Sequence, residues 1–219
     1  MKGEKKIKKM EIVEEVEKGN QVLKIYIDEF PESPREWDNL GIIAYKHSKY
    51  NLGEEEINEP IEWLEEKLNL KNKNIYSNER LKELEDLFFK KFIALPLYLY
   101  DHSGITIQTS PFNCPWDSGK VGYIYTTKEQ IKEEGLTKEK ALNILENEIK
   151  YFDYYLVGEV YSYQIVEIKP IKKTIITEYP NGKKDKKSYN TTEEEIKDSC
   201  CGFLGDEGID QIKEETGFI

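Results

Sequence analysis

Apolar residues recur along the chain with two different spacings, and each spacing predicts a different kind of element. Residues 21–28 alternate apolar and polar positions, which is the two-residue period of a half-buried strand. Residues 61–70 and 81–88 place apolar side chains three or four positions apart, which indicates two amphipathic helices. A longer helix with the same spacing is expected over residues 137–156.

Short apolar or aromatic runs bounded by glycine and proline predict further strands. These strands are expected at residues 42–47, 92–100, 105–109, 121–126 and 160–168. A hairpin is expected where residues 171–179 and 183–189 flank Pro180-Asn181-Gly182, because proline and asparagine suit the centre of a turn.

Three shorter helices are also expected, two of them from capping signals. Ser33 can cap a helix that has Pro34 at its first position and ends before Gly41. A second short helix is expected over residues 10–18. A third is expected over residues 192–200, where a threonine followed three positions later by a glutamate forms a capping box.

The mixed order of helices and strands predicts an α+β fold, with one mainly antiparallel twisted sheet and several helices packed on it. The 219 residues contain no internal repeat and no low-complexity linker, so a single domain is expected over residues 1–219. Residues 1–10 carry five lysines and one glutamate, and we expect them to form a flexible basic arm.

Composition indicates a folded protein of a reducing compartment. The apolar fraction of 38% is low, but 15 tyrosines and 8 phenylalanines supply bulky core material. Three cysteines, of which Cys200 and Cys201 are adjacent, do not suit a disulfide framework. No apolar run approaches the roughly 20 residues of a membrane span, so we expect a cytoplasmic protein without a membrane partner.

The net charge of −11 is unevenly spread. Residues 28–68 carry twelve acids and four bases, and residues 193–219 carry nine acids and two lysines. Residues 169–187, in contrast, carry seven lysines and two acids. The acidic total argues against nucleic acid as the main partner, because phosphate binding depends on lysine and arginine. The acidic stretches indicate either a solvated surface or a face that occupies a nucleic-acid groove on another protein.

Asp101-His102-Ser103 contains the three residue types of a serine hydrolase triad. In an extended segment, Asp101 and Ser103 share a face that His102 does not, whereas a triad requires the base close to both partners. We therefore expect a polar turn closed by Gly104, with a hydrolase site as the alternative.

The segment Cys114-Pro115-Trp116-Asp117-Ser118-Gly119 combines unusual residues, and its proline and glycine predict a rigid loop. Two interpretations are open. Trp116 and Cys114 are buried anchors with Asp117 capping the turn, or Trp116 is presented to a partner as an anchor.

A thiol nucleophile at Cys114, activated by His47 or His102, is a further alternative. The three cysteines and two histidines are too few and too scattered to resemble a zinc site. No glycine-rich phosphate loop is present. We expect neither a metal nor a cofactor.

Five motifs follow one another along the chain: SPREWDNLG at 33–41, YNLG at 50–53, DHSGI at 101–105, CPWDSGKVG at 114–122 and DSCCGF at 198–203. Together they resemble a family of small acidic proteins encoded by bacteriophages and conjugative elements, and the likeness covers residues 22–205. The family has no established catalytic residues, so the resemblance assigns none. It implies a mobile-element setting, in which small acidic proteins often block host defence by binding a nuclease complex.

The leading hypothesis is therefore an anti-defence protein, of anti-CRISPR or antirestriction type. It would bind and inhibit a host nuclease or CRISPR effector complex by steric block or by nucleic-acid mimicry. The candidate contact residues are Trp37, Asp38, Glu54, Glu55, Glu56, Trp116 and Asp117. The alternative is a small cytoplasmic hydrolase or thiol enzyme that uses Asp101, His102, Ser103 and Cys114. The oligomeric state is left open.

Overall fold

A computed structural model describes residues 11–71 and 75–219 and shows an α+β chain, as expected. Its contacts group into two compact units. Unit 1 runs up to Pro31 and resumes at Gly158–Ile219, and unit 2 is Glu32–Val157. The sequence predicts one domain with one sheet, whereas each unit has a sheet of its own. The basic arm expected at residues 1–10 lies outside the described residues.

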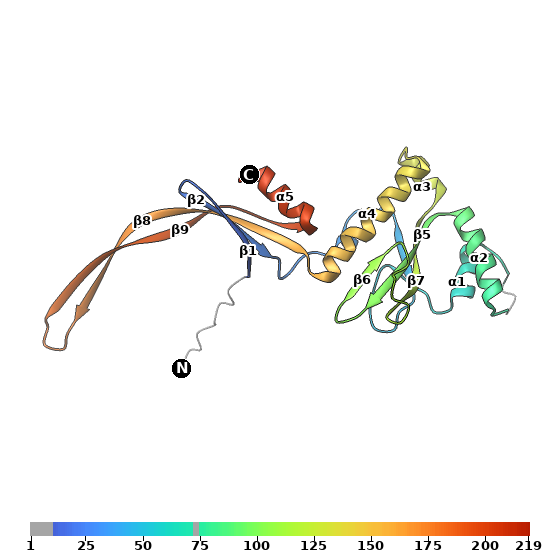
Figure 1. The fold of residues 1–219 in the computed structure, drawn as a ribbon, viewed down its shortest axis with the longest axis horizontal. Coiled ribbons are helices and arrows are strands. Elements are labelled where there is room, and N and C mark those ends of the chain that lie inside the picture. Colours follow the sequence, from blue (N-terminus) through green and yellow to red (C-terminus); the bar gives the residue numbers. More distant parts are fainter. Residues whose placement is uncertain (1–10, 72–74) are drawn as a thin grey trace. The chain divides into compact units, whose positions relative to one another are not determined.

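Unit 2 is built on a five-stranded sheet with the order β4-β3-β7-β5-β6. Figure 1 labels β5, β6 and β7 of this sheet. Its strands are β3 (Ile42–Tyr45), β4 (Glu55–Glu56), β5 (Ile93–Asp101), β6 (Ile105–Gln108) and β7 (Ser118–Thr126). The pairs are antiparallel except for the short pair of β3 with β4. The four strands expected in this region are confirmed, with ends shifted by a few residues.

Helices cover both faces of this sheet, because alternate residues of a strand point to opposite sides. The α1–α2 pair covers a core that contains Ala44, Tyr123 and Tyr125, whereas α3 and α4 cover a core that contains Ile43 and Ile124. The three amphipathic helices expected here are confirmed. The helices of unit 2 are α1 (Pro60–Lys67), α2 (Asn78–Lys91), α3 (Lys128–Glu133) and α4 (Lys138–Val157).

The helix expected to follow Ser33 is a single turn, the 3-10 helix η1 (Pro34–Glu36). Ser33 caps it as predicted, with its side chain accepting the backbone N–H of Arg35 at 3.2 Å. The helix does not continue to Gly41.

Unit 1 holds a four-stranded antiparallel sheet with the order β1-β2-β8-β9. Its core contains Leu23, Ile25 and Tyr163 from the sheet, together with Ile212 from a C-terminal helix. The hairpin expected around Pro180-Asn181-Gly182 is confirmed, but its strands are far longer than predicted. The elements of unit 1 are β1 (Ile12–Lys18), β2 (Gln21–Ile27), β8 (Val160–Glu178), β9 (Lys184–Leu204) and α5 (Gly205–Thr216).

The helix expected over residues 10–18 is wrong, because the described part of this segment contains β1. Lys18 pairs with Gln21, so Gly19-Asn20 forms a two-residue turn between β1 and β2. Gly19 has a φ of 65°, which glycine adopts without strain. Pairing with β2 overrides the helix preference of the glutamates and lysine in this segment.

The helix expected over residues 192–200 is also wrong, because this segment belongs to β9. Its charged side chains meet charges of opposite sign across the sheet. Lys24 Nζ donates to the Glu194 carboxylate at 2.7 Å, and Lys197 Nζ lies 2.9 Å from that of Glu167. Such cross-strand pairs stabilise a sheet and cannot be recognised from one strand alone.

The helix α5 is not among the expected elements, although the sequence contains signals for it. Ile209 and Ile212 are spaced as on one helix face. Gly217 ends the helix with a φ of 71°, and the N–H of Phe218 donates to Lys213 O at 3.0 Å. Within the described residues, no helix has both the length and the apolar character needed to cross a membrane.

The strand β7 pairs with β3 on one side and β5 on the other, and Gly122 makes this close packing possible. A Cβ added at Gly122 would lie 1.9 Å from Ala44 O and 2.8 Å from the Cα of Tyr45. A Cβ added at Gly119, in the same strand, would meet nothing within 4 Å. The fold therefore requires a residue without a side chain at Gly122 but has room for one at Gly119.

We expect Gly122→Ala to lower the free energy of unfolding of unit 2 by about 3 kcal/mol, because backbone must move to admit the methyl group. The control Gly119→Ala is expected to leave it unchanged or raise it by less than about 1 kcal/mol. Urea unfolding followed by tryptophan fluorescence measures unit 2, since Trp37, Trp63 and Trp116 all lie in it. Equal losses in the two variants would contradict the prediction.

Candidate functional site

Trp116 projects from the loop between β6 and β7 and is 91% exposed. The loop is braced from within. The Ser118 hydroxyl donates to the carbonyl oxygen of Cys114, and the N–H of Asp101 donates to Asp117 O at 2.9 Å. This exposure excludes the interpretation of Trp116 as a buried anchor. A rigid loop that holds an exposed indole is instead the arrangement expected of a binding anchor.

Asp117 lies between the thiol of Cys114 and the imidazole of His102, the two groups of the alternative thiol-enzyme hypothesis. Its Oδ2 atom lies 3.7 Å from Cys114 Sγ and 3.6 Å from His102 Nδ1. In a nucleophilic triad the histidine stands between the nucleophile and the carboxylate, because it carries the proton from one to the other. Here the carboxylate occupies the central position, and a thiolate at Cys114 would face a like charge.

A second group of polar side chains surrounds Asp101, at the end of β5. The Tyr50 hydroxyl lies 3.3 Å from one Asp101 oxygen, and Lys49 Nζ lies 3.6 Å from the same oxygen. The ring of His47 stacks on Tyr50, with 4.9 Å between the ring centroids. His47 Nδ1 accepts the backbone N–H groups of Lys49 and Tyr50, which leaves Nε2 as the position of the ring proton.

Asp101, His102 and Ser103 do not form a triad. The three residues turn the chain from β5 into β6, with the N–H of His102 donating to Gly104 O at 3.0 Å and Ser103 at a φ of 59°. No hydrogen bond or ion pair joins the side chains of these three described residues. His102 faces Asp117 instead, and its side chain is 65% exposed. The polar turn expected here is confirmed.

A cavity of about 320 Å³ lies beside the Trp116 loop. Its walls carry two carboxylates, those of Asp101 and Asp117, and two aromatic rings, those of His47 and Trp116. Carboxylates repel phosphate, so this surface suits the cationic or neutral side chains of a protein better than nucleic acid. The remaining lining residues are Leu99, Ser118, Gly119 and Val121.

The other predicted contact residues belong to the segment around η1 and to β4. Trp37 is 44% exposed and Asp38 is exposed. Glu54 and Glu55 are engaged within unit 2, because Glu54 accepts the N–H of Ile43 at 2.7 Å and Glu55 binds Lys67 at 2.8 Å. Glu56 is exposed. Two of the three consecutive glutamates thus hold internal bonds, which weakens this stretch as a mimic of phosphates.

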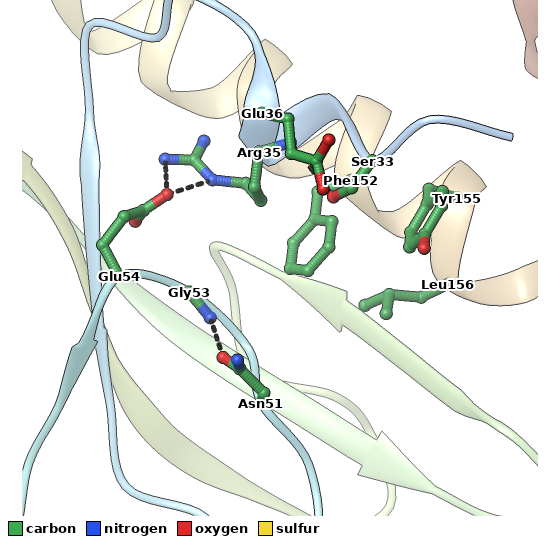
Figure 2. A pocket seen from close by; sticks show the side chains of 9 residues that line it. All are labelled: Ser33, Arg35, Glu36, Asn51, Gly53, Glu54, Phe152, Tyr155 and Leu156. Atoms are coloured by element: carbon green, nitrogen blue, oxygen red, sulfur yellow. Dashed lines mark hydrogen bonds and ion pairs between the residues drawn. The ribbon is translucent and has the colours of Figure 1, made fainter.

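The SPREWDNLG motif contributes a partly buried charge network, seen in part in Figure 2. Arg35 is clamped by two carboxylates and one carbonyl: its guanidinium lies 2.8 Å from Glu54 and 3.2 Å from Glu148, and donates to Gly41 O at 2.7 Å. Glu148 also accepts the N–H of Leu40 at 2.7 Å. The network ties α4 to the segment that precedes β3.

A cavity of about 340 Å³ borders this network, with Phe152, Tyr155 and Leu156 of α4 forming its apolar wall (Figure 2). Arg35 is the cation on its polar wall, and two carboxylates already neutralise it. The cavity therefore offers no free positive charge to an anionic ligand. We assign this motif to the stability of unit 2. Burial raises the pKa of Glu148, whereas the hydrogen bonds from Leu40 and Arg35 stabilise its charged form and oppose that rise.

In the parts of the chain that the structure describes, no group of three or more histidine, cysteine, aspartate or glutamate side chains could hold a metal ion. The three cysteines are free. Comparison of the chain with protein-family models, with curated proteins and with solved structures found no match. The contacts and charges of the two units are therefore the basis for assigning a function.

We expect Arg35→Met to lower the free energy of unfolding of unit 2 by about 3 kcal/mol near pH 8, because it leaves the largely buried carboxylate of Glu148 without its cation. The loss should be smaller near pH 5. Without Arg35 the pKa of Glu148 rises further, and a carboxyl whose pKa is raised in the folded state contributes stability that is present at low pH and lost as the pH rises.

The control for this variant is Lys46→Met, which removes an exposed ion pair with Glu59 at 4.0 Å. Exposed pairs contribute at most about 1 kcal/mol, so we expect a small loss at both pH values. Urea unfolding at pH 5 and pH 8 measures both variants. A loss in Arg35→Met that is the same at the two pH values would contradict the assignment of Glu148 to the network.

Proposed function

We propose that this chain is a non-catalytic binding protein of a mobile genetic element, and that it inhibits a host nuclease or CRISPR effector complex by occupying its surface. The observation that carries this proposal is the braced loop with Trp116 exposed at 91%. A rigid aromatic side chain buries a large area on binding and loses little conformational freedom, which makes tryptophan a frequent anchor of protein interfaces. The resemblance of the five motifs to mobile-element proteins supports the choice of partner.

Steric block fits the contacts better than mimicry of nucleic acid. The carboxylates of Glu54 and Glu55 are bound to groups of the same unit. The cavity beside Trp116 combines the carboxylates of Asp101 and Asp117 with aromatic rings. We therefore expect an interface with an aromatic centre and an acidic rim, whose affinity depends weakly on salt.

Replacing Trp116 by alanine should weaken binding of the nuclease complex at least 30-fold, since a central anchor contributes about 2 kcal/mol or more. The measurement is recovery of identified nuclease or effector subunits on the tagged full chain, from a lysate of a defence-proficient host, at low and moderate salt. The matched control is Phe30→Ala, because Phe30 is also 91% exposed but belongs to unit 1.

Loss of recovery in Trp116→Ala together with normal recovery in Phe30→Ala is the expected result. Equal recovery of nuclease subunits by the two variants would show that Trp116 is not the anchor of the interface. A wild-type chain that recovers no nuclease subunit and gives phage or plasmid DNA no protection in cells would end the proposal.

A thiol enzyme is the second candidate, because Asp117 lies 3.7 Å from Cys114 Sγ and 3.6 Å from His102 Nδ1. It requires a thiolate at Cys114 activated by the imidazole, and the intervening carboxylate of Asp117 disfavours that state. The exposed thiols of Cys200 and Cys201 provide an internal reference for reactivity.

We expect iodoacetamide at neutral pH to modify Cys114 no faster than Cys200 or Cys201, and His102→Ala to change none of the three rates by more than about twofold. Mass spectrometry of the digested protein measures the three rates in one sample. Modification of Cys114 more than about tenfold faster than its references, with loss of that advantage in His102→Ala, would favour the enzyme.

A further inference from the structure

In unit 1, β8 and β9 continue well beyond the sheet to which they belong (Figure 1). The pairing of β2 with β8 ends where Gln21 lies opposite Glu167. Beyond that point β8 and β9 stay paired, from Lys169 opposite Glu193 to Glu178 opposite Lys184. We call residues 169–193 the ribbon arm. Ten paired residues in each strand, at about 3.3 Å per residue, give it a length of roughly 33 Å.

The ribbon arm has no core of its own. Residues 172–190 are all exposed. A two-stranded ribbon in water is marginally stable, because ordering its backbone is offset by little burial. Its side chains therefore contribute to something other than the packing of unit 1.

Positive charge is concentrated on this arm. Residues 169–193 carry seven lysines and three acids, although the whole chain has a net charge of −11. Lys169 and Lys184 form ion pairs with glutamates of the same unit. Lys172, Lys173, Lys183, Lys186 and Lys187 form no ion pair with any described residue. Five unneutralised lysines on one ribbon repel each other until an anion binds.

The pairing register distributes the lysines over both faces. Lys173 lies opposite Tyr189, and Lys187 lies opposite Ile175, so these four side chains share one face. Lys172 and Lys186 point to the other face, where Ile176 lies opposite Lys186. Each face thus combines two lysines with an apolar residue.

We propose that the ribbon arm binds duplex DNA, with the ribbon in the major groove and the lysines of its two faces against the phosphates of the two groove walls. The major groove of B-DNA is about 12 Å wide and admits a two-stranded ribbon. The arm's length matches one helical turn of about 34 Å. Lysines on both faces suit a groove that has phosphates on both sides.

A lipid surface fits the arm less well, because Ile175 and Ile176 point to opposite faces and leave no apolar side to insert. Duplex RNA also fits less well, because its major groove is deep and narrow. The acidic remainder of the chain limits the affinity and keeps the binding sensitive to salt. This inference does not rest on the proposed nuclease partner.

The test uses the purified full chain and a fluorescent 24-base-pair DNA duplex, with binding followed by anisotropy from 50 to 200 mM salt. Four phosphate contacts predict that the affinity falls roughly 100-fold over this range. Reversing Lys172, Lys173, Lys186 and Lys187 to glutamate should remove measurable binding. The charge-matched control reverses four exposed lysines of unit 2, which are Lys82, Lys132, Lys138 and Lys140.

Circular dichroism and thermal unfolding show whether both quadruple variants keep the fold. Should the arm variant lose it, Lys172→Gln combined with Lys187→Gln removes one lysine from each face and is expected to reduce the salt slope by about two.

Salt-sensitive binding by the wild type that is lost in the arm variant and kept in the control supports the proposal. No binding at 50 mM salt would overturn it, as would equal loss in the two variants. Displacement of the DNA by polyglutamate at an equal concentration of negative charge would indicate that the arm binds an acidic protein instead of DNA. Tighter binding to phosphatidylserine vesicles or to duplex RNA would also reject duplex DNA as its ligand.

Discussion

The pairing of β7 with both β3 and β5 is the interaction on which unit 2 depends. Strand β7 contributes Tyr123 and Tyr125 to the core that α1 and α2 cover, and Ile124 to the core that α3 and α4 cover. Gly122 lets the strands approach where no side chain fits. The same pairing continues into the Trp116 loop, because the N–H of Asp101 donates to Asp117 O. The loop that carries Trp116 is therefore held by the strand pairing that builds the core.

Charge has a different role in each part of the molecule. In unit 2, Arg35 and its carboxylates neutralise one another and join α4 to the chain before β3. At the base of β8 and β9, Lys24 and Lys197 meet glutamates across strands. Farther along the ribbon arm, lysines without such partners accumulate. The chain has a net charge of −11, but its ribbon arm is positively charged. The local charge of the arm, not the net charge of the chain, determines what the arm can bind.

The chemistry near Cys114 shows why residue types alone are a weak guide to catalysis. His102, Asp117 and Cys114 do come together, but the carboxylate stands between the other two. Asp101 binds Tyr50 and lies near Lys49, apart from the imidazole that follows it in sequence. A surface that presents an indole beside carboxylates is suited to recognition, and it needs no proton transfer to act.

Local patterns in the sequence determined the amphipathic helices, most strands of unit 2, the cap at Ser33 and the turn at Gly182, because spacing and turn chemistry act over a few residues. They also identified the Trp116 loop and the lysines of residues 169–187. The tertiary structure alone decided that residues 12–18 and 192–200 are strands, since their stability comes from pairing with partner strands. It likewise decided that Glu54 bonds to groups of its own unit, that Trp116 is exposed, and that the lysines lie on two faces of one ribbon. Each of these depends on register and packing between segments, which no single segment encodes.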